Sequence, residues 1–209
     1  MALTTYALLN TTIANYLNRT DLTSYLGDFI TLTESRMNRE LRVREMVNTD
    51  TTTTTVAGTQ SYSLPSGFLE ASAVIYQSNP YRTLRFMANG DFYRQYNVTQ
   101  TSGLPTFFTI VGENILLGVA PDSAQTLQID FYKTITALSE SNTTNTILTN
   151  YPELYLYGAL AESSPFLMQD ERLDTWARLY KEALANANLS SEKGSITSSP
   201  MQMSATGII

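Results

Sequence analysis

The spacing of apolar residues near the N-terminus predicts two helices. One apolar face recurs at helical spacing and predicts a first helix over about 5–18; its residues are Tyr6, Leu9, Ile13, Tyr16 and Leu17. Thr20 or Asp21 can cap a second helix, which we expect to run to about Met46. The inward-facing positions of that helix are Leu22, Leu26, Phe29, Leu32 or Thr33, Met37 and Leu41.

The second half of this second helix is rich in charge. Glu40 follows Arg36 by four residues and precedes Arg44 by four, so both arginines can pair with it on one helix face. Such a face is either solvated or a contact between subunits in which arginines set the register. The candidate subunit-interface residues are therefore Arg36, Arg39, Glu40 and Arg44.

Between Val47 and Ile135 the pattern becomes that of short strands. The β-branched run 50–56 is a poor helix former. Turn residues separate segments that alternate between apolar and polar positions. We expect a hairpin over 106–119 with its turn at 112–114, and one short helix over 89–96 capped by Asn89. Further strands are expected over 60–64, 70–76, 81–87 and 126–134. Strands at this spacing predict a small antiparallel sandwich or barrel-like lobe inserted between helices.

The C-terminal third returns to a helical pattern. Asn150 is expected to cap a helix that has Pro152 in its first turn and Glu153 at its third position. This helix is apolar nearly all round, so it should be buried between others, and Pro165 must kink or end it. A last helix is expected over about 170–189.

The fold class that follows is α+β. We expect a helical bundle built from residues 1–47 and 147–189, with an inserted β-rich lobe over 48–146. Residues 190–209 lack any period and are predicted to form an extended C-terminal arm. The apolar residues of this arm are Met201, Met203, Ile208 and Ile209.

The amino-acid composition limits the catalytic and metal-binding chemistry that the chain can support. The 209 residues include no His and no Cys, which removes histidine-based triads, cysteine nucleophiles and most zinc sites. Five glycines are isolated turn glycines, so we find no phosphate-binding loop; they are Gly58, Gly67, Gly90, Gly103 and Gly112. We predict no enzyme activity, no metal and no cofactor. Catalysis by carboxylates alone could cleave a glycosidic bond. Its candidates are Glu153, Glu162, Asp170 and Glu171, which we interpret instead as helix-surface and capping residues.

Charge and hydropathy argue against two kinds of partner, phosphate groups held tightly at the surface and membranes. The net charge of −6 argues against a surface whose main task is binding phosphates, although DNA could pass beside it. No segment approaches the roughly 18 consecutive apolar residues of a membrane span, and the first residues do not resemble a signal peptide. We therefore expect no membrane partner.

Four patterns, in this order, resemble the head-to-tail adaptor (connector) proteins of short-tailed bacteriophages. They cover most of the chain between Leu22 and Leu189. They are ESRMNRELR at 34–42; YSLPSGFLE at 62–70; GLPTFFTI at 103–110 with ILLGVAP at 115–121 and LQIDFYK at 127–133; and LTNYPELYLYGALAE at 148–162, followed by Trp176 and Tyr180.

The resemblance implies a structural virion protein. Such adaptors form a ring, usually of twelve copies, between the portal and the tail nozzle, and DNA passes through the centre without sequence-specific binding. It implies a place at the head–tail interface of the virion after synthesis in the host bacterial cytoplasm. In such adaptors a C-terminal extension reaches toward the portal, so we assign portal docking to Met201, Met203, Ile208 and Ile209 as a hypothesis.

Three other functions fit the sequence less well. A tail nozzle or other tail-completion protein would share the composition. A cell-wall glycosidase would have to rest on the carboxylates above. A secreted carbohydrate-binding sandwich would leave the helices unexplained.

Overall fold

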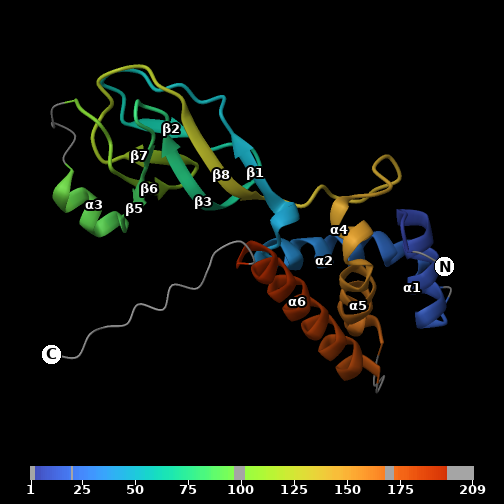
Figure 1. Ribbon diagram of the computed structural model, residues 1–209. Coiled ribbons are helices and arrows are strands. Elements are labelled where there is room, and N and C mark those ends of the chain that lie inside the picture. Colours follow the sequence, from blue (N-terminus) through green and yellow to red (C-terminus); the bar gives the residue numbers. More distant parts are fainter. Residues whose placement is uncertain (1–2, 20, 97–101, 168–171, 197–209) are drawn as a thin grey trace, which may run out of the picture. The chain divides into compact units, whose positions relative to one another are not determined.

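The computed structural model describes residues 3–19, 21–96, 102–167 and 172–196 (Figure 1). These form two compact units, a helical unit of Met1–Glu45 with Ile135–Ile209 and a strand unit of Met46–Thr134. Helices at both ends of the chain and two sheets between them confirm the α+β class. The sequence predicts a strand-rich lobe over 48–146, and the strand unit begins at Met46 and ends at Thr134.

Helix α1, Tyr6–Leu17, forms where the apolar spacing predicts it. Thr5 caps it, since its hydroxyl oxygen accepts a hydrogen bond from the Leu8 N–H at 3.3 Å. Leu9, Ile13 and Leu17 repeat every four residues and are buried.

Helix α2, Leu26–Glu40, follows a short 3₁₀ turn, Thr23–Tyr25. The prediction that this helix reaches Met46 is wrong, because Leu41 adopts an extended conformation with φ −89° and ψ 131°. Leu41 and Val43 are both fully buried, which alternation in an extended segment allows. A second 3₁₀ turn, Arg44–Met46, then leads into the strand unit.

Hydrogen bonds from the last helix hold this extended segment. Asn188 Oδ1 accepts from the Arg42 N–H at 2.9 Å, and Ser191 Oγ accepts from the Arg44 N–H at 2.8 Å. Asn188 Nδ2 also donates to the Glu40 carbonyl at 3.2 Å. Partners distant in the sequence thus replace the hydrogen bonds that further helical turns would have made.

Two helices replace the single start expected at Asn150. Helix α4, Thr146–Asn150, is capped by Asn145, whose side-chain oxygen accepts from the Leu148 N–H at 2.8 Å. Helix α5, Pro152–Glu162, begins with Pro152 as predicted, but Asn150 does not cap it because Asn150 ends α4. Tyr151 precedes α5 without a side-chain capping bond.

Helix α5 is the centre of the helical unit. It contacts α1, α2 and the last helix, and most of its residues are buried, which confirms the prediction from its apolar surface (Figure 1). A Cβ on Gly158 would lie 2.3 Å from Thr33 Cγ2, so a glycine lets α5 approach α2 closely. The helix ends at Glu162, ahead of Pro165, in a 3₁₀ turn, Ser164–Phe166.

The last helix, α6, spans Arg172–Ile196. It continues seven residues beyond the predicted end at Leu189, so the prediction of an extended arm is wrong for residues 190–196, which are helical. Ser191 explains part of the difference, because its buried hydroxyl bonds the backbone of Arg44. Residues 197–209 lie outside the described residues.

The strand unit contains two four-stranded sheets. The first has the order β1-β8-β3-β4 and is antiparallel; its strands are Val47–Asp50, Leu127–Lys133, Phe68–Tyr76 and Arg82–Thr83. The second has the order β2-β7-β6-β5; its strands are Ser61–Ser63, Asn114–Leu117, Phe107–Val111 and Arg85–Phe86. The predicted hairpin is β6–β7, with Gly112 at φ +60° in its turn. The pair β5–β6 is parallel, so the second sheet is mixed rather than purely antiparallel.

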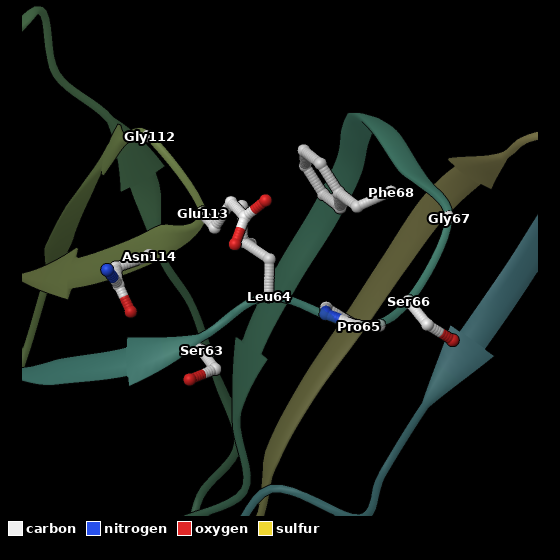
Figure 2. A pocket seen from close by; sticks show the side chains of 9 residues that line it. All are labelled: Ser63, Leu64, Pro65, Ser66, Gly67, Phe68, Gly112, Glu113 and Asn114. Carbon is white, nitrogen blue, oxygen red and sulfur yellow. The ribbon is translucent and has the colours of Figure 1, made fainter.

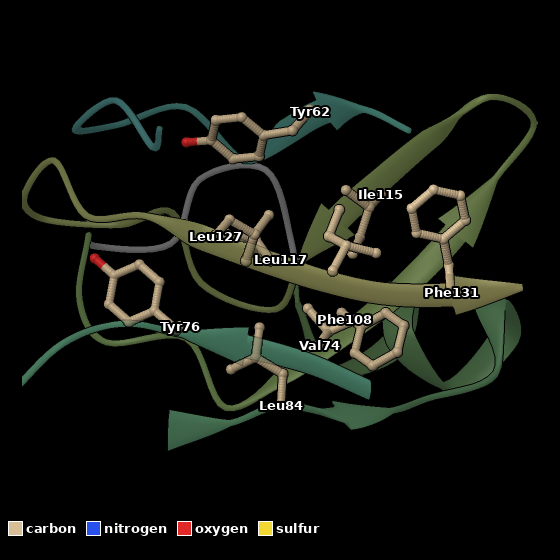
Figure 3. Close-up of a cluster of buried hydrophobic side chains, with 10 residues drawn as sticks. Tyr62, Val74, Tyr76, Leu84, Phe108, Ile115, Leu117, Leu127 and Phe131 are labelled. Atoms are coloured by element: carbon tan, nitrogen blue, oxygen red, sulfur yellow. The ribbon is translucent and has the colours of Figure 1, made fainter. Parts of the chain in front are cut away.

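Side chains from both sheets share one core, which makes the unit a small sandwich (Figure 3). The buried members are Tyr62, Val74, Tyr76, Leu84, Phe108, Ile115, Leu117, Leu127, Ile129 and Phe131. The short helix α3, Asn89–Gln95, lies where predicted, but Ala88 is its cap residue. Asn89 instead accepts a hydrogen bond from the Thr109 hydroxyl through its side-chain oxygen.

Candidate subunit-contact site

Arg36 is fixed inside the helical unit. Its guanidinium lies 3.4 Å from the Glu40 carboxylate and 3.4 Å from Glu162 Oε1, and 4.4 Å from the centre of the Tyr180 ring. Only 23% of the side chain is exposed. These contacts join α2, α5 and α6, so Arg36 positions its neighbours within one subunit.

The Arg36 cation lowers the pKa of the Tyr180 hydroxyl, whereas the carboxylates of Glu40 and Glu162 raise it. Burial raises the pKa of Tyr180 to about 12; Glu40 adds to this shift and Arg36 opposes it. The hydroxyl is buried and finds no hydrogen-bond partner in the described part of the chain. Tyr180 therefore serves as an uncharged packing surface for Arg36.

Arg44 does not share the helical face of Arg36 and Glu40. The expected pair of Glu40 with Arg44 is wrong, because α2 ends at Glu40 and Arg44 pairs with Glu45 at 3.4 Å. The Arg44 side chain is 72% exposed, and Arg39 is exposed in the last turn of α2. The accessible part of the predicted site thus consists of Arg39, Glu40 and Arg44.

The predicted portal-docking residues Met201, Met203, Ile208 and Ile209 all lie outside the described residues. The same holds for Asp170 and Glu171 among the carboxylates considered for catalysis. Of the other two, Glu162 pairs with Arg36, and Glu153 lies half-buried in the first turn of α5.

A buried carboxylate, Glu34, was missed by the sequence analysis. Its side chain is 5% exposed, and Oε1 accepts from the Leu138 N–H at 2.8 Å and from the Tyr155 hydroxyl at 3.0 Å. Asn145 Nδ2 donates to the same Tyr155 hydroxyl at 2.7 Å. A signal was present, since residue 34 lies on the inward stripe of α2 beside Ile30 and Met37, which are buried.

Burial dominates the titration of this pair. It raises the pKa of Glu34, although the hydrogen bonds from Leu138 and Tyr155 oppose the shift. Burial and the nearby Glu34 carboxylate raise the pKa of the Tyr155 hydroxyl. The network joins α2, α4, α5 and the loop before α4, which is a structural arrangement rather than a pair of reacting acids.

The helical unit contains an aromatic cluster with two exposed rings, Tyr25 and Phe166. The Tyr25 and Phe166 rings are 5.2 Å apart, and Phe166 meets the buried Phe29 ring edge-on at 5.3 Å. Arg19 donates to the Phe166 carbonyl at 3.3 Å and pairs with Asp21. Aromatic and arginine side chains of this kind are frequent in protein interfaces.

The sequence left Leu32 and Thr33 as alternatives for one inward position of α2. Leu32 is exposed and Thr33 is buried, so Thr33 occupies the inward position.

The second family-like pattern, at 62–70, lines a pocket of about 380 Å³ in the strand unit (Figure 2). The loop between β2 and β3 is tied to the β6–β7 turn, because the Leu64 N–H donates to the Glu113 carbonyl at 2.9 Å. Gly67 has φ +74°, and a Cβ there would lie 2.7 Å from Thr134 Oγ1. The pattern therefore encodes a loop conformation that only glycine fits well.

Among the described residues, no three His, Cys, Asp or Glu side chains gather as metal ligands. None of their helices combines the length and the apolar character that crossing a bilayer requires.

Comparison with known families decides the identity. A sequence profile described as SU10 adaptor protein matches residues 4–204. The chain belongs to the SU10 adaptor protein family. The match covers both units, and it agrees with the resemblance to phage head-to-tail adaptors. The adaptor is thus a structural protein of a bacteriophage virion, associated with other phage head and tail proteins. No curated protein matches the chain.

Proposed function

We propose that this adaptor forms a ring of twelve identical copies that joins the portal to the tail nozzle and surrounds the DNA exit channel. The observation that carries the proposal is the family match over residues 4–204, which includes both units. A ring requires heterologous contacts, since a symmetric two-fold dimer leaves no axial channel. The net charge of −6 suits a wall that DNA passes without adhering.

We assign the following roles to individual residues and units. Arg39, Glu40 and Arg44 supply polar contacts between neighbouring copies, while Arg36 holds the helices that present them. Met201, Met203, Ile208 and Ile209 dock on the portal as apolar anchors of a C-terminal arm. The units Met1–Glu45 with Ile135–Ile209 and Met46–Thr134 act as ring body and inserted lobe.

The mass of the assembly tests the proposal directly. Sedimentation velocity of the purified adaptor with portal-bearing heads, followed by electron microscopy of the tail vertex, should show a closed ring of adaptor density beneath the portal. A stable two-fold dimer as the sole adaptor assembly in virions would refute it. A tail-completion role elsewhere would appear as adaptor density away from the portal.

A further inference from the structure

Exposed charged and aromatic side chains flank a buried leucine where the chain crosses from one sheet to the other. Strands β4 and β5 are the edge strands of the two sheets, and the chain passes from one sheet to the other through the buried Leu84 between them. The residues on either side of Leu84 are exposed; they are Arg82, Thr83, Arg85 and Phe86. Edge strands with free side chains of this kind are available to a partner.

Two of these residues are arginines that line one pocket of about 420 Å³. Its walls also include Thr83, Pro105, Thr106 and Phe107. Neither Arg82 nor Arg85 forms an ion pair within the described part of the chain. Two guanidinium groups beside two threonine hydroxyls form a site for an anion, and a planar carboxylate can accept from a guanidinium through both oxygens.

The opposite end of β6 carries the opposite charge. The pocket lies beside the first residue of β6, Phe107, whereas Glu113 lies in the turn after its last residue, Val111. Glu113 is exposed and has no ion pair among the described residues, and Val111 beside it is partly exposed. At about 3.4 Å per residue, the strand keeps the two ends on the order of 15 Å apart. Glu113 therefore cannot reach the arginines of its own chain.

We propose that the Glu113 turn of one copy docks in the Arg82–Arg85 pocket of the next copy. The carboxylate binds the two guanidinium groups, and Val111 packs against the apolar wall formed by Pro105 and Phe107. Unlike ends that meet in this way give a head-to-tail contact, which closes into a ring when the rotation between copies is suitable. The inference rests on the proposed ring and names one contact within it.

The absence of native Cys makes a disulfide test clean. Thr106→Cys places a thiol in the wall of the pocket, and Asn114→Cys places one beside Glu113, while the charged residues stay intact. Within one copy these positions lie at opposite ends of β6, too far apart for a disulfide, whose Cα atoms are at most about 7 Å apart. In assembled particles the double variant should form a ladder of covalent multimers, and an equal mixture of the two single variants should form dimers only.

Charge reversal shows whether the named groups make the contact. Arg85→Glu in the double-cysteine protein should lower the cross-linked yield about tenfold or more, the change expected from a close interfacial charge pair. Adding Glu113→Arg together with Arg82→Glu should restore the yield, because every charge in the contact is then reversed. Arg94→Glu is the matched control, because Arg94 is also exposed in the strand unit but lies 3.5 Å from Asp91 of its own chain. Circular dichroism should show the same fold for all variants.

The outcomes separate this contact from the ring itself. A normal ring without the ladder overturns the contact and leaves the proposed function standing. Failure of the unmodified adaptor to form any ring overturns both. If Arg82→Gln with Arg85→Gln weakens duplex DNA binding while the ladder remains, the pocket binds phosphate and the contact is overturned.

Discussion

At the scale of single residues, Glu34 has an unusual position for a charged side chain. It lies in the core of the helical unit, and its partners are one backbone N–H and one tyrosine hydroxyl, with no cation at either. A buried ionised carboxylate without a cation is unfavourable, so burial raises the pKa of Glu34 above its ordinary value of 4.5. The folded protein consequently binds this proton more tightly than the unfolded chain.

This difference predicts a pH-dependent stability. The contribution of Glu34 to folding is fully present below pH 4.5 and is lost as the pH rises through the raised folded pKa. Glu34→Gln retains a side-chain oxygen to accept from Leu138 and Tyr155 but never ionises. The free energy of unfolding of the variant, relative to the parent, should therefore increase between pH 4 and pH 8 in urea titrations.

Glu182→Gln on α6, where the carboxylate is exposed, controls for the loss of one charge. Curves for parent and Glu34→Gln that stay parallel across this pH range would show that Glu34 ionises as easily folded as unfolded. Glu34→Leu should instead destabilise the protein at every pH, because it removes the acceptor of the Leu138 N–H and of the Tyr155 O–H.

At the scale of elements, the end of α2 depends on a helix that lies far along the chain. Asn188 and Ser191 on α6 bond the backbone N–H groups of Arg42 and Arg44. These bonds hold residues 41–44 extended where helix propensity and charge spacing favour further helical turns. Two side chains of α6 thus stabilise the extended segment that follows α2.

Removing those side chains tests this dependence. Asn188→Ala with Ser191→Ala should lower the free energy of unfolding by about 1–3 kcal/mol for each backbone N–H left unpaired. Amide hydrogen exchange at Arg42 and Arg44 should accelerate, since these N–H groups lose their acceptors. Asn186→Ala on an exposed position of the same helix is the control and should have little effect. Unchanged exchange at both amides would refute the role of the two side chains.

These elements also show what sequence reasoning can reach. The position of α1, the β6–β7 hairpin and Pro152 at a helix start were all predictable, because each depends on residues within a few positions. The end of α2 and the length of α6 were not, because each depends on bonds between residues nearly 150 positions apart. Arg39 and Arg44 remain predicted interface residues, chosen from charge alone, whereas the bridge from Arg36 to Glu162 required the tertiary structure.

At the scale of the whole molecule, the length of α6 fixes where a truncation should be made. A chain that ends at Leu189 would lose Ser191 and with it the bond to Arg44. A chain that ends at Ile196 keeps all of α6 and removes only residues 197–209, which include the proposed portal anchors.

The longer truncation product should separate docking from folding. We expect the free energy of unfolding of the chain ending at Ile196 to lie within about 0.5 kcal/mol of the parent value, because this chain keeps all of α6 and the bond from Ser191 to Arg44. It should nevertheless fail to attach stably to portal-bearing heads in a sedimentation assay. The chain ending at Leu189 should also lose stability. Normal attachment by the chain ending at Ile196 would remove portal docking from Met201, Met203, Ile208 and Ile209.

The pairing of β1 with β8 has a consequence for how such a protein can change. Val47, the first residue of β1, is the register partner of Tyr132 near the end of β8. The chain therefore enters and leaves the sandwich at neighbouring points, about 5 Å apart between paired Cα atoms. A tight turn can span that gap. During evolution, recombination can therefore enlarge, trim or exchange the sandwich without altering the path of the chain through the helices.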